Sequence, residues 1–393
     1  MASLVSGLAL LCVAAFAGEA PVRWDGENAR ALIAYAAGVE RHGLASDAYD
    51  PAALKQALAD GDAIRVELAA SALFRTIARD ISTGVTPAAA RRLWRFAPTA
   101  PDDSAIDDAM TAALATRKVA EALDSFAPPY DDYRKISVAL ASEPDGHARL
   151  RLLRNMERWR WMPRDLGRDY ILVNIPAYEA VIVRDGREVA RRRVIVGARK
   201  TPTRQFSASI EAVTLNPTWF VPASIVAESV GALLDKKPQE AERLGYYRAE
   251  TGGVRQKPGP QNALGQVKFE MPNPYSVFIH DTPNRTYFDR KRRALSHGCI
   301  RIDDAIGVAA AVLGGPWSKG DLEALVASGT TARIELPAPL PVYVVYFTLM
   351  SGADGALVAH DDVYGLDKEL LAGPVRGEVT SEASSKCPGD APA

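Results

Sequence analysis

The residue with the clearest chemical potential is Cys299, which follows Gly298 and precedes an apolar residue. His280 lies nineteen positions upstream, at the end of a β-rich run. A thiol reacts as its thiolate, and free cysteine has a pKa near ~8.5, so a nucleophilic cysteine needs a base or a positive environment. His280 can supply the base. Gly298 allows a tight turn in which the amides of His297, Gly298 and Cys299 converge as an oxyanion hole.

Six basic residues near Cys299 in the sequence supply a positive environment. These residues are Arg285, Arg290, Lys291, Arg292, Arg293 and Arg301. The same spacing also fits a buried structural cysteine with two incidental histidines. The residues alone do not distinguish a nucleophilic cysteine from a structural one. A zinc site is disfavoured. His297 and Cys299 are only two positions apart, and a catalytic zinc needs three converging ligands and an open position. We therefore expect no metal and no cofactor.

The region before Pro163 is predicted to be a helical scaffold domain over residues 21–160. One helix is expected between Asp62 as N-cap and Gly84, and another over residues 105–123. The stretch 149–161 places Leu152, Met156 and Trp159 on one core stripe, with arginines opposite. The histidines outside the Cys299 region are expected at the surface, and they are His42, His147 and His360.

After Pro163 the spacing of apolar residues changes from a helical to a strand period. A mostly β domain is therefore expected over residues 165–370. Asp185-Gly186 is a strong hairpin signal between two β-rich runs. Further strands are predicted at 209–217, 266–272, 275–281, 331–337 and 341–351. A long insert over residues 217–265, helical between about 224 and 243, is typical of a lid or binding loop. The fold class is therefore α+β.

Composition and the chain ends limit the function further. The 47 Lys and Arg residues balance 48 Asp and Glu residues, which argues against a nucleic-acid binder. The three cysteines, Cys12, Cys299 and Cys387, lie too far apart for a disulfide framework. Residues 1–17 resemble a cleavable signal peptide, and no stretch of the mature chain is apolar enough for a transmembrane span. Residues 377–393 are expected to be a disordered tail.

Several motifs in one order resemble a known family. Ser296-His297-Gly298-Cys299-Ile300-Arg301, with His280 upstream, is similar to the active-site signature of the L,D-transpeptidases, whose catalytic domain is the YkuD type. The segments at 155–163, 170–180, 201–206, 216–225, 255–269 and 280–283 resemble the large Gram-negative branch of that family. The resemblance is dense from about residue 155 to 365.

The resemblance implies a peptidoglycan L,D-transpeptidase with Cys299 as nucleophile and His280 as general base. A tetrapeptide donor would acylate Cys299 with release of D-alanine, and a diaminopimelate amine would then form a 3→3 cross-link. Supporting roles would fall to the turn residues Ser296, His297 and Gly298 and to Arg301. Trp219, Phe278 and Asn216 would contact substrate, and the insert would be the capping lid over the donor site.

Two departures from the family accompany this match. Large relatives carry a peptidoglycan-binding module between the helical region and the helix at 149–161, whereas residues 140–149 connect them directly here. Relatives also place Tyr where this chain has Phe278. The protein is expected in the periplasm, where the wall would be engaged through the scaffold, the lid or partner proteins of the outer membrane or of wall synthesis.

Three other functions use the same nucleophile and base and differ only in the acceptor. They are L,D-carboxypeptidase activity with water, exchange of a D-amino acid, and attachment of a protein to peptidoglycan. A hypothesis of another class is a non-catalytic wall-binding scaffold. The intact string around Cys299 argues against it.

Overall fold

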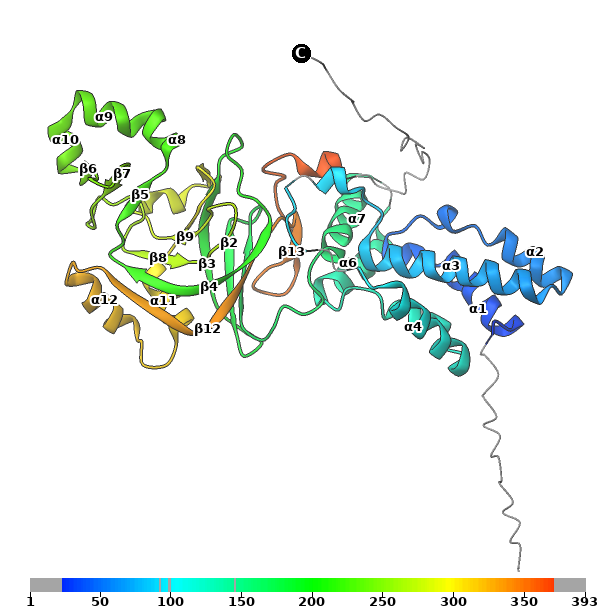
Figure 1. Cartoon of the computed structure of the whole chain (residues 1–393). Helices are drawn as coiled ribbons and strands as arrows, with labels where there is room; N and C mark the ends of the chain where they lie inside the picture. The colour runs from blue at the N-terminus through cyan, green and yellow to red at the C-terminus, as the bar shows by residue number, and fades with distance from the viewer. Residues whose placement is uncertain (1–22, 92, 98–99, 145, 371–393) are drawn as a thin grey trace, which may run out of the picture.

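A computed structural model of the chain describes residues 23–91, 93–97, 100–144 and 146–370. Within them a helical unit is followed by a β unit, and the insert projects from the end of the β unit far from the helices (Figure 1). This order confirms the expected α+β class with a helical N-terminal region and a mostly β domain. The expected signal peptide and C-terminal tail lie outside the described residues, as do Cys12 and Cys387.

The helical unit contains seven α-helices, whose bounds are α1 (Gly26–Ala37), α2 (Ala52–Asp60), α3 (Ala63–Thr83), α4 (Asp103–Thr116), α5 (Val119–Asp124), α6 (Asp131–Ser142) and α7 (His147–Arg160). Asp62 caps α3 by accepting from the amides of Ile64 and Arg65, and Gly84 ends it, as predicted. The single helix expected over 105–123 is instead two, because Arg117 adopts a left-handed conformation with φ 57° after α4. The first five helices share one apolar core.

The β unit is a nine-stranded sheet that closes on itself as a barrel. Its strands are β1 (Tyr170–Asn174), β2 (Glu179–Arg184), β3 (Arg187–Gly197), β4 (Phe206–Leu215), β8 (Val267–Glu270), β9 (Ile279–His280), β10 (Ala294–Ser296), β11 (Ile300–Ile302) and β12 (Ala332–Val345). The order β10-β3-β11-β9-β8-β4-β12-β1-β2 becomes a ring because β2 also pairs with β3. The hairpin at Asp185-Gly186 forms as expected, since Asp185 and Gly186 both adopt positive φ.

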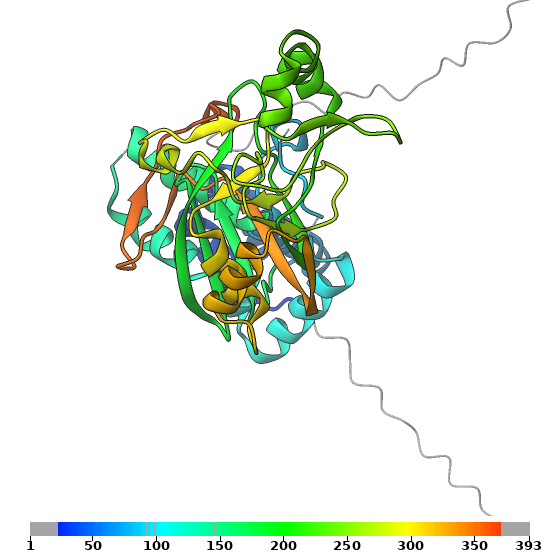
Figure 2. The ribbon, with the colours of Figure 1, turned by 90° about the vertical axis from the view of Figure 1, so that its left-hand side faces the viewer.

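Two helices and a hairpin complete the β unit. Helices α11 (Ala305–Leu313) and α12 (Lys319–Ala327) pack apolar side chains onto the barrel core. Strands β13 (Leu349–Ser351) and β14 (Leu357–Ala359) form a separate two-stranded sheet on the side facing the helical unit. Figure 2, turned by 90°, shows the insert standing above the barrel and these two helices in front of it.

The insert folds as a small layer of its own. It contains β5 (Trp219–Val221), α8 (Ala223–Ile225), the π-helix η4 (Val226–Val230), α9 (Gly231–Lys236), α10 (Pro238–Arg243), β6 (Tyr246–Arg248) and β7 (Val254–Gln256). The helical stretch expected between 224 and 243 is therefore present. The three strands pair in the order β5-β7-β6, and Val221, Val230 and Val254 form the insert's own apolar core.

Two strand predictions were wrong. The runs 331–337 and 341–351 were expected as separate strands, but β12 continues through Pro337, Pro339 and Pro341 by shifting its register against β4 between Glu335 and Leu340. The run 275–281 contributes only the two residues of β9. The segment before it is a loop held by Asn273, whose side chain bonds to the backbone of Met271, Tyr275 and Val277.

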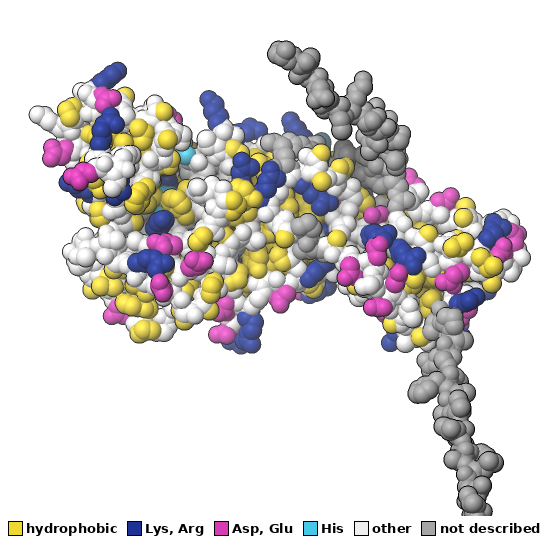
Figure 3. All heavy atoms as spheres, in the orientation of Figure 1, with side chains coloured by type: hydrophobic (Ala, Val, Ile, Leu, Met, Phe, Trp, Pro, Cys, Tyr) yellow, Lys and Arg dark blue, Asp and Glu magenta, His cyan; other side chains and the backbone are white. Residues whose placement is uncertain are grey.

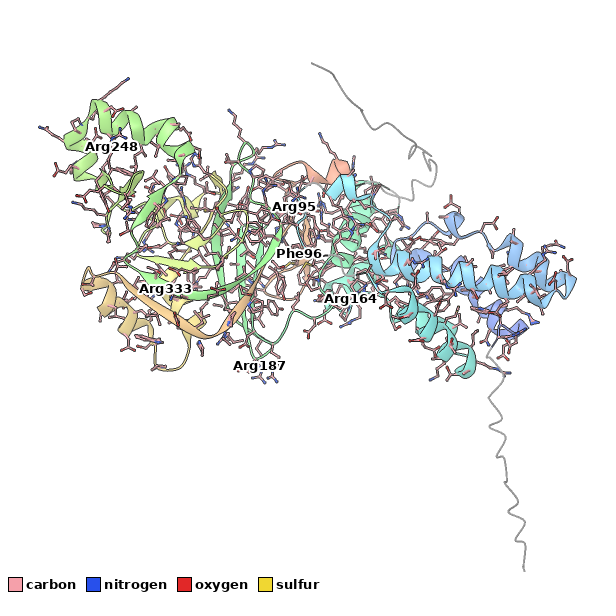
Figure 4. All side chains as sticks on the ribbon, in the orientation of Figure 1. Arg95, Phe96, Arg164, Arg187, Arg248 and Arg333 are labelled. Atoms are coloured by element: carbon pink, nitrogen blue, oxygen red, sulfur yellow. The ribbon has the colours of Figure 1, made fainter. Side chains whose placement is uncertain are left out.

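The arginines of α7 also differ from expectation. Leu152, Met156 and Trp159 do pack in a core shared between the helical unit and the barrel. Arg158 and Arg160, expected on the opposite side of the helix, are 2% and 0% exposed. Arg160 pairs with Glu157 at 2.7 Å, and Arg158 pairs with Asp367 at 2.5 Å and donates to Thr348 at 3.1 Å. The Arg158 pair joins α7 to the segment after the barrel, and Arg160 joins it to the helical unit by donating to the carbonyls of Ile81 and His42. The labelled Phe96 and Arg164 lie at the same junction in Figure 4.

His42 was expected at the surface and is instead 6% exposed. Its ring lies between Tyr35 and Tyr133 and bonds to Asp124 at 3.0 Å. Burial is the largest influence on this imidazole and lowers its pKa from 6.5 to about 4, against the opposing effect of Asp124. His42 is thus a neutral part of the helical core.

We predict that Arg158→Ala lowers the free energy of unfolding by about 3 kcal/mol, because it leaves the Asp367 carboxylate buried without its cation. Arg134→Ala removes an exposed ion pair with Asp131 and serves as the matched control, with an expected loss of about 0.5 kcal/mol. Denaturant unfolding of both variants measures the difference. Equal losses would show that the buried pair adds no more than the surface pair.

Candidate active site

A row of polar side chains crosses three neighbouring barrel strands. Lys268 on β8 is paired in register with His280 on β9, and His280 is paired with Arg301 on β11. Residues in register on neighbouring strands lie on the same face of a sheet. The next register along, Phe269 with Ile279 and Ile300, belongs to the barrel core. The alternation of buried and polar residues therefore puts the three basic side chains together on the outside of the barrel.

Cys299 lies directly before β11, at the end of a turn that begins at Ser296. Ser296 Oγ donates to the Cys299 carbonyl at 2.5 Å and accepts from the Gly298 amide at 3.1 Å. Thr203 Oγ1 donates to the Gly298 carbonyl at 2.8 Å. Gly298 has φ 116°, a conformation that side chains rarely adopt. Ser296, Gly298 and Thr203 thereby fix the backbone that presents the thiol.

The Cys299 thiol is half-buried and protonated at neutral pH. Its Sγ lies 3.8 Å from the carbonyl of Ser276. Burial raises the pKa of the thiol above its ordinary value of 9.0, and the Phe278 backbone, Arg301 and Lys268 act in the opposite direction. The positive environment expected for a nucleophile is present, but desolvation outweighs it in the resting protein.

His280 is 5% exposed and neutral. Burial is the main cause that lowers its pKa from 6.5 to about 3, followed by the charge of Arg301, while the backbone carbonyls of Asp281 and Leu264 raise it. Its Nδ1 donates to the carbonyl of Asp281 at 2.5 Å, because a carbonyl can only accept. In the neutral ring this leaves Nε2 as the basic nitrogen.

Thiol and imidazole are therefore both neutral. His280 is on β9 and Cys299 directly precedes the parallel neighbour β11, so the two residues lie on adjacent segments of the barrel. In the described residues they share no direct hydrogen bond, and the polar contact of Sγ is the Ser276 carbonyl. Catalytic hydrogen bonds often tighten only when substrate is bound.

The other predicted residues lie in different environments. Phe278 borders the row, with its ring 5.7 Å from that of His280. Arg301 is half-buried and its Nε has no hydrogen-bond partner among the described residues. Trp219 packs against the core of the insert, 6.4 Å from Tyr246. Asn216 does not fit a substrate-binding role. It is 6% exposed, and its amide donates to the carbonyls of Val326 in α12 and of Thr330 after it.

The insert contacts the turn before Cys299 through a side-chain hydrogen bond. His297 Nε2 lies 3.0 Å from Glu228 Oε2, which comes from the π-helix η4. Both side chains are at least half exposed. Short π-helical segments are frequent at functional sites. The contact joins the residue two positions before Cys299 to the insert.

Sequence reasoning missed Lys268, Thr203 and Glu228. Lys268 carried a visible signal, because it is a cation between the apolar residues Val267 and Phe269. Thr203 lies in the segment 201–206 that resembles the family, but nothing in the sequence indicated its contact with Gly298. Glu228 carried no signal, since its contact with His297 is distant in sequence. Across the described residues no group of three His, Cys, Asp or Glu side chains converges to hold a metal ion. The described helices likewise include none that is long and apolar enough to cross a membrane.

The surface around the site does not mark a polyanion-binding face. Figure 3 shows acidic and basic side chains interspersed over the view of Figure 1, including the insert, on which Figure 4 labels Arg248. Several of the arginines expected to surround the thiol point elsewhere. Arg285 pairs with Asp281 at 3.1 Å, and Arg293 donates to the carbonyls of Val194 and Tyr178. The charge at the thiol comes from Arg301, which was expected there, and from Lys268, which was not.

Comparisons with known proteins agree with this geometry. Residues 168–335 match the family model of the L,D-transpeptidase catalytic domain, and residues 18–140 match that of a scaffold domain. A Haemophilus influenzae protein named "Putative L,D-transpeptidase" is 28% identical over 253 residues, 59% of this chain and 51% of that protein. The chain thus spans about half the length of this curated relative.

Two solved structures show more distant similarity. The catalytic domain of the Enterococcus faecium L,D-transpeptidase, acylated by ertapenem, is 13% identical with a TM-score of 0.24, covering 46% of this chain and 99% of that one. The Mycobacterium smegmatis L,D-transpeptidase is 12% identical with a TM-score of 0.25, covering 45% and 58%.

We predict that alkylation of Cys299 by iodoacetamide accelerates with rising pH and has its midpoint above 9.0, because burial disfavours the thiolate. The measurement follows the mass of the peptide that contains Cys299. His280→Gln is expected to leave the midpoint almost unchanged, since the imidazole is neutral over this range. A midpoint below 7 that rises in His280→Gln would instead reveal a thiolate–imidazolium pair.

Proposed function

Because residues 168–335 belong to the family of L,D-transpeptidase catalytic domains, we propose that this protein transfers peptidoglycan stem peptides through a thioester on Cys299. The observation that supports this most directly is the pairing of β9 with β11, which sets a neutral imidazole beside a half-buried thiol. The reaction proposed is cleavage of a tetrapeptide donor with release of D-alanine, followed by a 3→3 cross-link to diaminopimelate.

The neutral state of both groups indicates how the acylation step proceeds. A thiol with a raised pKa cannot attack as a preformed thiolate at neutral pH, so its proton must leave as the bond from Sγ to the carbonyl carbon forms. His280 accepts that proton. The imidazolium is unfavourable in this buried site next to Arg301, which makes it a strong acid toward the leaving amine. The carbon–nitrogen bond then breaks, and the proton departs with D-alanine.

Stabilisation of the oxyanion falls to the turn before β11. The Gly298 amide already donates to Ser296 Oγ. Of the three amides expected at this turn, those of His297 and Cys299 are therefore the better candidates, with the nearby Arg301 charge as support. Phe278 has no hydroxyl to add where relatives carry Tyr.

The insert is proposed as a lid that favours an amine acceptor over water. Its π-helix already contacts the catalytic turn through Glu228 and His297. A closed lid excludes water from the thioester and so limits hydrolysis. In the periplasm, where we place the protein, the wall would be reached through the scaffold, the lid or a partner protein.

We predict that the purified protein, incubated with disaccharide-tetrapeptides, forms cross-linked dimers and a carbapenem adduct on Cys299. Intact mass detects the adduct, and muropeptide mass analysis separates dimers from trimmed tripeptides. Cys299→Ala is expected to lose both products. His280→Gln is expected to slow acylation by roughly 10²–10⁴-fold, the range for loss of a general base. Tripeptides without dimers would show an L,D-carboxypeptidase, and an adduct that persists in Cys299→Ala would show a different nucleophile.

We further predict that Glu228→Gln raises the ratio of tripeptide to dimer, because it removes the carboxylate that bonds to His297 between the lid and the turn. The expected change is about twofold to fivefold, which corresponds to about 0.5–1 kcal/mol for one hydrogen bond. Glu242→Gln, on α10 of the same insert, is the matched control. An unchanged ratio together with unchanged hydrogen exchange over 226–230 would exclude a role for this contact in lid closure.

A further inference from the structure

Two cations beside Cys299 form no ion pair with a carboxylate in the described part of the chain. No carboxylate lies within 4.0 Å of the Lys268 amine, whose Nζ is instead 4.9 Å from the centre of the Phe278 ring. Glu270, the next acidic residue on the same strand, is bound by Arg333 at 2.9 Å and by Thr214 at 2.6 Å. Arg301 Nε is buried and makes no hydrogen bond.

Three arginines elsewhere on the barrel surface form ion pairs with carboxylates. Arg191, Arg192 and Arg193 each bond to carboxylates at 3.0 Å or less. A partly buried cation without an anion retains an unfavourable desolvation cost, and a donor left without an acceptor adds to it. Lys268 and Arg301 therefore form an anion-binding site that the folded chain itself does not fill.

The position of these cations relative to the reacting groups indicates which anion they bind. They flank His280 on its two neighbouring strands, so their α-carbons are roughly 10 Å apart, twice the spacing between strands. Their register places both side chains on the same face of the sheet as the imidazole between them. Both charges also reach the thiol, because each lowers the pKa of Cys299. An anion held there lies within a few bonds of the scissile amide.

We propose that Lys268, together with Arg301, binds the free carboxylate of the amino acid that leaves during acylation. This inference rests on the proposed function and adds the specificity of the same site. In the donor tetrapeptide the carboxylate of the terminal D-residue is separated from the scissile nitrogen by one carbon atom. Holding that carboxylate beside His280 brings the leaving nitrogen to the group that must protonate it.

A specificity follows from this geometry. A donor whose terminal carboxylate is amidated, or extended by a further residue as in a pentapeptide, carries no charge at this position. Charge-assisted hydrogen bonds contribute more than neutral ones, so such donors lose binding in the acylation step. Lys268 is thus a residue that restricts the enzyme to trimmed tetrapeptides.

The test compares two donors on the full-length chain, a disaccharide-tetrapeptide with a free terminal carboxylate and the same molecule as its terminal amide. The measured quantity is kcat/KM for release of D-alanine or D-alaninamide. The native protein is expected to prefer the acid by roughly tenfold to hundredfold. Lys268→Met is expected to remove most of this preference by slowing the acid only, whereas Lys268→Arg retains it. Lys55→Met, on the exposed face of α2, is the matched control.

The possible outcomes distinguish failure of the carboxylate-binding proposal from failure of the proposed function. Equal slowing of the acid and the amide by Lys268→Met would show that the lysine acts only through the thiol, and it would overturn the inference. A native protein that accepts both donors equally would overturn it as well. If neither donor acylates a Cys299 that iodoacetamide still alkylates, the proposed function itself fails.

Discussion

The alternation of core-facing and outward-facing side chains along one short barrel strand determines where His280 lies. Strand β9 has only two residues, Ile279 and His280, and both of its neighbours pair with it. Ile279 is 1% exposed and packs in the core between Phe269 and Ile300. Because side chains alternate along a strand, this anchor forces His280 outward between Lys268 and Arg301. A one-residue slip of β9 would exchange the base for an isoleucine, so core packing fixes the position of the imidazole.

Both buried ion pairs and apolar contacts hold the helical unit against the barrel. Arg158 and Arg160 are buried in α7. Arg158 bonds to Asp367 after the barrel, and Arg160 donates to the carbonyls of Ile81 and His42 in the helical unit. Glu157 in turn accepts from the amides of Val85 and Thr86 at the end of α3. A buried pair is costly to break, which makes the junction specific in its geometry. Scaffold and catalytic domain are therefore held in one arrangement without an intervening module.

The sequence predicted those parts of the fold that depend on local patterns. The N-cap Asp62, the turn at Asp185-Gly186 and the helical stretch of the insert follow from residues close in the chain, and all are present. Two of the failures have long-range causes. The runs 331–337 and 341–351 were expected as separate strands, but β12 continues because β4 pairs with it on both sides of a register shift. Arg158 was expected opposite the core, and its burial depends on Asp367, 209 residues away.

The candidate site also combines residues that the sequence predicted with one that only the fold brings in. Its charges and burial account for the protonation of the thiol and the imidazole. The family motif identified Cys299, His280 and Arg301, whereas Lys268 belongs to the site only because β8 pairs with β9. Its charge and that of Arg301 lower the pKa of both thiol and imidazole, and burial drives these two pKa values in opposite directions. The resting pair is therefore neutral. An anionic substrate would offset the flanking cations and make protonation of His280 easier, so the base would become effective when the donor is in place.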